Sequence, residues 1–280
     1  MATRTDLAVE SEGNLNENID GVEKREIYVD GIGVITIDIK NENVAKSMGL
    51  KIGRYVTIQA NSMFMPENIA NIKKILTNQL KIFLEDKKSV FVVGLGNRNI
   101  TPDMLGPSVV DKIVATRHIF GKMEKILGYE NLKIVSAIAP GVLGQTGIET
   151  TEIVKSILNF IKPDLVLVVD ALAARGFERL GSTIQITNTG ISPGSGVENK
   201  RKELSKDVLG VPVLMVGVPT VVDMYDVAKN NEEIYNKALM LMTPKNVDLV
   251  VKRSSFIISD SINKALFPQI PEKELQILAG

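Results

Sequence analysis

Apolar residues recur along this chain at two spacings that alternate from one segment to the next. Short apolar runs, typical of buried strands, occupy residues 89–95, 132–138, 164–170, 182–188 and 211–218. Apolar residues at helical spacing predict helices over residues 66–86, 106–127, 149–161, 219–229, 231–241 and 245–264. Strands that alternate with helices are typical of parallel βαβ units, in which helices cover both faces of the sheet.

The N-terminal region follows a different pattern. Residues 1–26 are polar and charged, and we expect them to form an exposed or partly ordered arm. Residues 27–40 are rich in β-branched side chains around the turn signal Asp30-Gly31, which predicts a hairpin. A short strand is expected over residues 54–60. The whole pattern predicts one α/β domain with a mostly parallel sheet flanked by helices, phosphorylase/hydrolase-like, and an antiparallel hairpin as an N-terminal appendage.

Composition narrows the chemistry that this domain can perform. The 280 residues include 33 basic and 33 acidic side chains, a balance that argues against a dedicated nucleic-acid binder. The absence of cysteine excludes disulfides, thiolate metal sites and cysteine nucleophiles. The single histidine, His118, cannot supply a zinc site that needs two or three imidazoles. With no signal peptide and no apolar run long enough for a bilayer, the expected location is the cytosol.

Gly94-Leu95-Gly96-Asn97 lies where a strand leads into a helix, which is the position of a dinucleotide-binding loop. The pattern lacks the third glycine, where Asn99 stands, and the next strand does not end in an acid. A sharp backbone turn above the sheet is the simpler interpretation of these glycines.

Two acids follow apolar strands at the edge of the sheet where α/β proteins place their sites. Asp103 stands in Thr101-Pro102-Asp103, a typical helix start with Thr101 as the N-cap, where an acid also complements the helix dipole. Asp170 directly follows an apolar strand. It either forms a salt bridge with a base such as Arg175 or acts in catalysis as a desolvated carboxylate. If the two strands are neighbours, both acids face one crevice and can activate a water molecule together.

Other candidates have plainer explanations. Gly194, Ser195 and Gly196 lie in a glycine-rich loop whose backbone donors can hold a substrate carbonyl, or which is simply a tight turn. Ser195 lacks the elbow sequence of a hydrolase nucleophile. His118 is expected in the middle of a helix, packed or solvated.

Four long motifs resemble one known family. VVGLGNRNITPDMLGP, ATRHIF, VVDALAARG and ITNTGISPGSGVENKR are similar to the germination (spore) protease family, and the resemblance extends from residue 4 to residue 248. It implies an atypical aspartic endopeptidase that starts the degradation of small acid-soluble spore proteins in the spore core, with Asp103 and Asp170 as catalytic acids. It also implies a fold similar to that of hydrogenase maturation proteases and assembly as a homotetramer.

The same resemblance implies a zymogen that removes its own leader. Residues 5–10, TDLAVE, are similar to the family's substrate sites, which predicts cleavage between Asp6 and Leu7. The leader is then residues 1–6, and residues 7–280 form a single peptidase domain.

Alternatives remain open at this stage. A maturation-type protease of the same fold would hold a divalent ion between Asp103 and Asp170, although no histidine stands near to complete such a site; we expect no cofactor and no metal. A non-catalytic binding protein for spore proteins would tolerate loss of either acid. A dinucleotide-dependent enzyme would bind nicotinamide.

Overall fold

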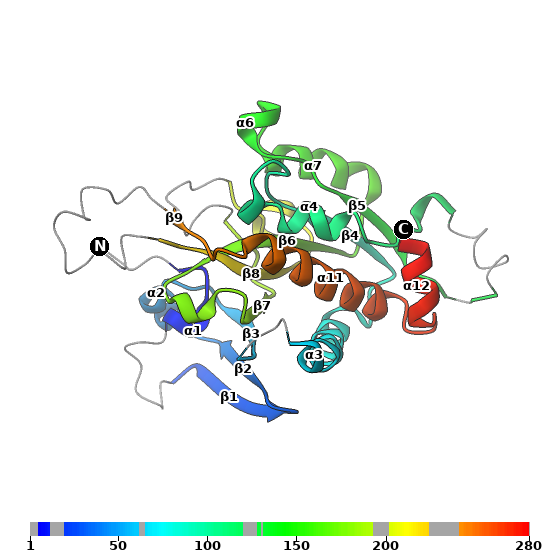
Figure 1. The fold of residues 1–280 in the computed structure, drawn as a ribbon. Helices are drawn as coiled ribbons and strands as arrows, with labels where there is room; N and C mark the ends of the chain where they lie inside the picture. Colours follow the sequence, from blue (N-terminus) through cyan, green and yellow to red (C-terminus); the bar gives the residue numbers. More distant parts are fainter. Residues whose placement is uncertain are drawn as a thin grey trace.

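The sheet predicted from the sequence is present and reaches further into the N-terminal region than expected (Figure 1). The computed structural model describes residues 5–11, 20–61, 65–119, 128–129, 131–192, 202–223 and 241–279. Within them, a nine-stranded sheet has the strand order β1-β2-β3-β7-β8-β6-β4-β5, and β9 pairs with β8. The strands are β1 Val22–Val29, β2 Ile32–Ile39, β3 Gly53–Gln59, β4 Ser89–Gly94, β5 Ile134–Ile138, β6 Leu165–Ala174, β7 Thr183–Thr187, β8 Val213–Asp223 and β9 Leu241–Met242.

Pairing direction divides the sheet into two parts. Parallel pairs join β8, β6, β4 and β5, as the alternation of strands and helices predicted. Antiparallel pairs join β1 to β2, β2 to β3, β3 to β7 and β7 to β8, so the expected hairpin continues the main sheet. The hairpin turns at Asp30 and Gly31, whose φ angles of 51° and 79° are those of a tight primed turn. The α/β class with a helix-flanked sheet is confirmed, but the sheet is mixed and not mostly parallel, because the N-terminal strands and β7 add antiparallel pairs to it.

Helices cover both faces of the sheet. The longer helices are α3 Pro66–Leu84, α7 Thr150–Ile161, α11 Val247–Leu266 and α12 Glu272–Ala279, and the shorter ones are α1 Ala8–Ser11, α2 Glu42–Met48, α4 Leu105–Val110, α6 Leu143–Thr146 and α8 Lys206–Leu209. Helices α3, α4 and α11 pack on one face, and α7 covers the other (Figure 1). No helix among the described residues is long and apolar enough to cross a bilayer.

Alternating side chains of β6 supply both cores. Leu165, Leu167 and Val169 enter the cluster beneath α3, α4 and α11. Val166 and Val168 enter the cluster beneath α7. Because strand side chains alternate between faces, residue 170 belongs to the α7 face of the sheet.

Three elements differ from the prediction by four residues or more at one end. The helix expected over residues 106–127 ends at Val110 in α4, and the segment that follows is held by Asn263 of α11, which binds both Lys112 and Val114. The helix expected from residue 219 is wrong as far as Asp223, because residues 219–223 continue β8 in pairing with β6 and β9. The expected strand ending at Asp170 instead continues four residues further, to Ala174, past an irregularity at Leu172 and Ala173.

The N-terminal arm also differs from the prediction. Leu7 and Ala8 are fully buried, and Leu7 belongs to the same apolar cluster as the α7 face of the sheet. Val22 to Glu26, expected in the arm, lie in β1. The expected helix over residues 231–241 falls almost entirely outside the described residues, and its last residue, Leu241, lies in β9.

Candidate active site

The register between β4 and β6 places Asp170 near the side of the sheet where the parallel strands have their carboxyl ends. Gly94 at the end of β4 pairs with Val169, and the N–H of Leu95 donates to the Val169 carbonyl over 2.8 Å. Asp170 is therefore level with Leu95 and next to the loop that leaves β4. Its side chain is buried, with 6% of the residue exposed.

Glycines let the loop after β4 fold back onto this edge. A Cβ built on Gly94 would lie 2.2 Å from the Gly106 carbonyl oxygen, and a Cβ on Gly106 would lie 2.3 Å from the Leu95 carbonyl oxygen. A Cβ on Gly96, whose φ is +118°, would lie 1.9 Å from the carbonyl oxygen of Asp103. Only glycine permits these approaches.

Asp103 reaches the same edge from a short 3-10 turn, η1 Thr101–Asp103. Thr101 is the first residue of this turn and makes no capping bond, so its predicted role as N-cap of a long helix is wrong. The hydroxyl of Thr220, on β8, donates to the Pro102 carbonyl over 2.8 Å and fixes the turn against the sheet. The sequence analysis did not identify Thr220 as a residue near the site, because its segment was expected to be helical.

Main-chain donors orient both carboxylates. The N–H of Asn97 donates to Oδ2 of Asp103 over 2.8 Å, and the N–H of Ala171 donates to Oδ1 of Asp170 over 2.9 Å. The Asn97 side chain accepts from the N–H of Asn99 and from the Gln145 amide, which ties the loop to α6. The bonds from Asn97 and Ala171 fix where the two carboxylates point.

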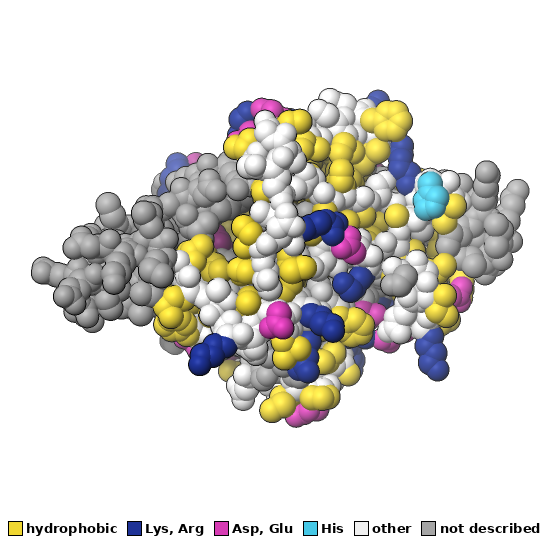
Figure 2. Space-filling view, turned by 45° about the horizontal axis from the view of Figure 1, so that its top comes forward, with side chains coloured by type: hydrophobic (Ala, Val, Ile, Leu, Met, Phe, Trp, Pro, Cys, Tyr) yellow, Lys and Arg dark blue, Asp and Glu magenta, His cyan; other side chains and the backbone are white. Residues whose placement is uncertain are grey.

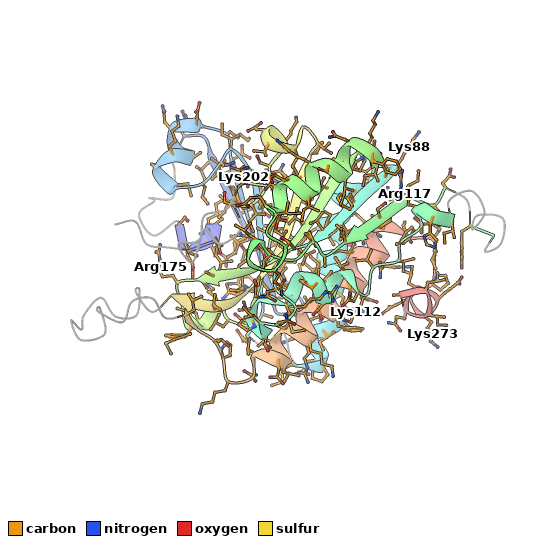
Figure 3. All side chains as sticks on the ribbon, turned by 90° about the horizontal axis from the view of Figure 1, so that it is seen from above. Lys88, Lys112, Arg117, Arg175, Lys202 and Lys273 are labelled. Atoms are coloured by element: carbon orange, nitrogen blue, oxygen red, sulfur yellow. The ribbon has the colours of Figure 1, made fainter. Side chains whose placement is uncertain are left out.

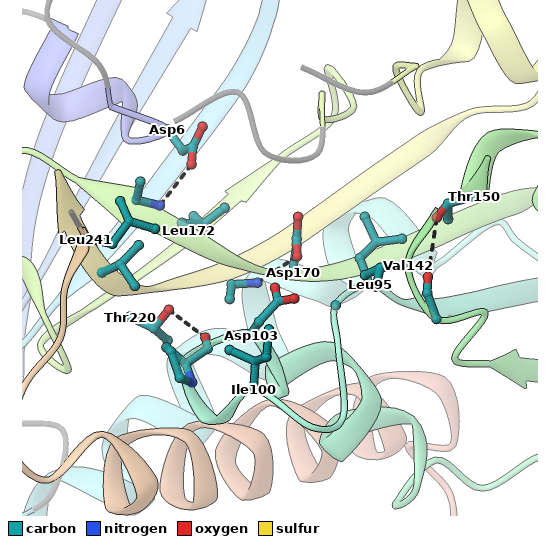
Figure 4. Close-up of a pocket in the computed structure, with 16 residues that line it drawn as sticks. Asp6, Leu95, Ile100, Asp103, Val142, Thr150, Asp170, Leu172, Thr220 and Leu241 are labelled. Atoms are coloured by element: carbon teal, nitrogen blue, oxygen red, sulfur yellow. Dashed lines mark hydrogen bonds between the residues drawn. The ribbon is translucent and has the colours of Figure 1, made fainter. Parts of the chain in front are cut away.

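Both acids line one cavity of about 320 Å³ (Figure 4). In the close-up, Asp170 projects from β6 and Asp103 projects from the turn below it toward the same space. The cavity walls are mostly apolar and include Leu95, Ile100, Val142, Leu172 and Leu241. The structure therefore brings together the two acids that the sequence singled out, in a concave apolar site of the kind that binds ligands.

Two further cavities adjoin this one along the sheet edge. One, of about 230 Å³, shares Gly96 and Gly141 with it and is lined by Arg98. The Arg98 guanidinium hydrogen-bonds Asp111 and holds the pKa of that carboxyl below its ordinary value. The other, of about 280 Å³, shares Asp6 with the central cavity.

Asp6, named from the sequence as a cleavage position, is itself a wall of the central cavity. Its N–H donates to the Ala173 carbonyl over 3.0 Å, and its Oδ2 accepts from the Ala173 N–H over 2.8 Å. Ala173 stands three residues beyond Asp170 on β6, roughly 10 Å along the strand. The Asp6–Leu7 bond is thus near the two carboxylates but is held beside Ala173.

The remaining candidates lie elsewhere. Gly194, Ser195 and Gly196 fall outside the described residues. His118 lies in the short turn η2 Arg117–Ile119 and is exposed, visible in cyan in Figure 2, so its expected place within a long helix is wrong. Among the described residues, no cluster of three or more histidines, cysteines or acids is arranged to hold a metal ion.

Comparison with known proteins identifies the family to which this chain belongs. The family model described as germination protease matches residues 2–237. The chain belongs to the germination protease family. It is 41% identical to the germination protease of Caldanaerobacter subterraneus subsp. tengcongensis over 99% of this chain and 98% of that protein. It is also 41% identical to the germination protease of Clostridium tetani, over 98% of each chain.

Two further comparisons cover smaller shares of the chain. The germination protease of Bacillus mycoides is 44% identical over 82% of this chain and 65% of its own length. Among solved structures, a NiFe hydrogenase maturation protease, HycI from Thermococcus kodakarensis, matches 66% of this chain and 98% of its own, with 15% identity and a TM-score of 0.37. Membership in the germination protease family supports a protease role in spore germination.

Proposed function

We propose that this member of the germination protease family hydrolyses peptide bonds with Asp103 and Asp170 as its catalytic acids. One observation carries the proposal: carboxylates from separate segments, a loop after β4 and the middle of β6, line the same apolar cavity. Two carboxylates in one desolvated site tend to share a proton, so that one acts as base while the other acts as acid.

The proposed reaction needs only these two groups and water. The ionised carboxylate accepts a proton from water as the water oxygen attacks the peptide carbonyl carbon. The protonated carboxylate donates its proton as the C–N bond breaks, which releases an amine and a carboxylic acid. The main-chain donors of Asn97 and Ala171 keep each carboxylate aimed during this exchange.

The proposed substrates are small acid-soluble spore proteins in the spore core, as family membership suggests. The chain is further proposed to be a zymogen that cuts between Asp6 and Leu7, leaving residues 7–280 as a single peptidase domain. The position of Asp6 in the wall of the carboxylate cavity supports this site. Assembly as a homotetramer in the forespore completes the proposal.

The test is cleavage of a purified small acid-soluble spore protein by wild type, Asp103→Asn and Asp170→Asn, each with and without a chelator. We expect both variants to remain folded and to lose at least ~10³-fold in rate, while the chelator has no effect. Asp207→Asn, which changes an exposed acid in α8, is the matched control and should keep the wild-type rate.

Two outcomes would overturn the mechanism. Loss of wild-type activity on adding chelator would replace it with metal-assisted hydrolysis in the same cavity. Full activity in either folded asparagine variant would remove that residue from the chemistry.

A further inference from the structure

Strand β8 carries one extra residue where it passes the cavity of the two acids. Leu172 and Ala173 are consecutive on β6, but their partners on β8 are Pro219 and Val221. Thr220 therefore stands between two paired residues, with no pairing position opposite it on β6. Such a β-bulge bends its strand and re-aims a side chain, and bulges are common beside active sites.

The apolar clusters show the same offset. Side chains of a regular strand alternate, so residues an even number apart share a face of the sheet. Val218 faces the cluster beneath α3, α4 and α11, but Val222 faces the cluster beneath α7. The alternation of β8 is thus shifted by one residue, in agreement with a bulge at Thr220. In Figure 3 this end of the sheet is marked by Arg175, the residue after β6, while Lys88, the residue before β4, marks the opposite end.

The bulge aims the hydroxyl of Thr220 at the turn that carries Asp103. Thr220 is fully buried, and its hydroxyl donates to the Pro102 carbonyl over 2.8 Å. Pro102 directly precedes Asp103 in η1, so this bond holds the backbone next to the carboxylate (Figure 4).

The same bond connects the two carboxylates through the sheet. Asp170 pairs with Gly217 on β8, three residues before Thr220. The path from Asp170 to Asp103 therefore follows the paired backbones of β6 and β8 and then the hydrogen bond from Thr220 to Pro102. Because η1 is a turn of only three residues, whereas the paired strands are rigid, this hydrogen bond determines how far the turn lies from the sheet.

We infer that Thr220 is a positioning residue, whose place in the bulge and whose hydroxyl hold Asp103 at the working distance from Asp170. The inference deepens the proposed function, on which it rests. Thr220 acts through the Pro102 carbonyl and takes no part in proton transfer. Proton sharing depends on the separation of the two carboxylates, so a small outward shift of η1 slows the reaction while the apolar cavity walls still bind the substrate.

The experiment measures cleavage of a purified small acid-soluble spore protein by full-length wild type, Thr220→Val and Thr220→Ser. Valine keeps the shape of threonine without its hydroxyl, whereas serine keeps the hydroxyl. We expect Thr220→Val to lower kcat by ~10²-fold and to change KM by less than about twofold. Thr220→Ser should keep kcat within about threefold of wild type.

Thr57→Val is the matched control. Thr57 is a fully buried threonine of β3, and its hydroxyl has no hydrogen-bond partner among the described residues. Its replacement should leave both kcat and KM at their wild-type values. Thermal unfolding confirms that each variant is folded, and Thr220→Ala, which also removes the hydroxyl, replaces Thr220→Val if the latter does not fold.

Two further measurements test whether Thr220 acts through Asp103. In the Asp103→Asn background, Thr220→Val should cause less than about a threefold further loss of rate, because the effects of residues that act as a unit are not additive. Amide hydrogen exchange of residues 97–106 should be faster in Thr220→Val than in wild type or Thr57→Val, since the turn has lost its hold on the sheet.

Three results would overturn the inference: a wild-type kcat in folded Thr220→Val, a loss confined to KM, or the full ~10²-fold loss repeated in the Asp103→Asn background. Failure of the proposed function would look different. Asp103→Asn would then cleave the spore protein at the wild-type rate, while faster exchange of residues 97–106 in Thr220→Val would still support the hold of Thr220 on the turn.

Discussion

Gly96 and Asp103 approach so closely that the carbonyl oxygen of Asp103 occupies the space where a side chain on Gly96 would begin. A Cβ at residue 96 would lie 1.9 Å from that oxygen and 3.1 Å from Oδ1 of the same residue. The position of one proposed catalytic carboxylate therefore depends on the absence of a side chain seven residues earlier.

The first prediction follows from this contact. Gly96→Ala should push the η1 turn away from the sheet and lower the rate of spore-protein cleavage by at least ~10²-fold, because small displacements of a catalytic group are costly. Gly210→Ala is the matched control, since Gly210 also has a positive φ, +74°, but nothing lies within 4 Å of its added Cβ. Equal rates for the two variants would show that the contact does not position Asp103.

The second prediction concerns the register of the N-terminal segment. The Glu10 carboxylate, bound by the N–H groups of Arg175 and Gly176, holds the Asp6–Leu7 bond beside Ala173 and away from Asp170. The proposed self-cleavage then requires the segment to shift along β6. Glu10→Gln weakens that hold, so we expect residues 1–6 to be lost several-fold faster, measured by the mass of the intact chain over time.

Glu67→Gln provides the matched control and should be processed at the wild-type rate. Slower processing of Glu10→Gln would contradict the prediction and would mean that the carboxylate is needed to present the bond for cleavage.

The sequence predicted those strands and turns whose conformation is determined by neighbouring residues. The apolar run that begins β6 and the Asp30-Gly31 turn are patterns of neighbouring residues, and the structure has a strand and a hairpin turn at these places. The two acids were found because each follows an apolar strand of the parallel part of the sheet, and parallel strands end at a common edge.

The sequence could not predict features that depend on distant partners. Residues 219–223 are a strand because β6 and β9 pair with them, although their own pattern is compatible with a helix. Leu7 and Ala8 appear as part of a polar arm, yet Gln185 and the end of β6 bind the segment that contains them. Thr220 and Gln185 have no distinctive sequence signal, so only the fold reveals their positions near the site.

The third prediction tests one such distant contact. Asn263 is buried in α11; its amide donates to the Lys112 carbonyl over 2.8 Å, and its oxygen accepts from the Val114 N–H over 3.0 Å. Asn263→Ala leaves both main-chain groups without this partner and should lower the free energy of unfolding by ~1–3 kcal/mol. Asn43→Ala, at an exposed position of α2, should change it by less than about 0.5 kcal/mol. Urea denaturation measures both, and a cost for Asn263→Ala as small as that of the control would contradict the prediction.

The fourth prediction uses an ion pair between α3 and α11. Lys73 lies 2.6 Å from Asp260, and their side chains are 16% and 9% exposed. Burial lowers the pKa of Lys73, but hydrogen bonds to Asp260 and Glu272 outweigh it and hold that pKa above its ordinary value of 10.5. A cationic group whose pKa is raised on folding stabilises the fold fully below its unfolded pKa and loses that contribution as pH rises through the folded pKa.

Lys73→Met should therefore lower the free energy of unfolding by ~1–3 kcal/mol at pH 8, because Asp260 remains almost buried without its cation. The difference from wild type should shrink as pH rises above about 10.5, where Lys73 of the unfolded chain loses its charge, and should be lost once pH passes the raised pKa of Lys73 in the folded protein. Lys74→Met changes the exposed neighbour on the same helix and should give a small difference at every pH. Thermal unfolding of the three proteins between pH 8 and pH 12 measures this, since groups common to all of them cancel in the comparison. The ammonium of Lys73 also lies 5.3 Å from the centre of the Phe256 ring. If the Lys73→Met difference stays constant across that pH range, packing of the lysine stem over Phe256 stabilises this contact and the charge of Lys73 does not.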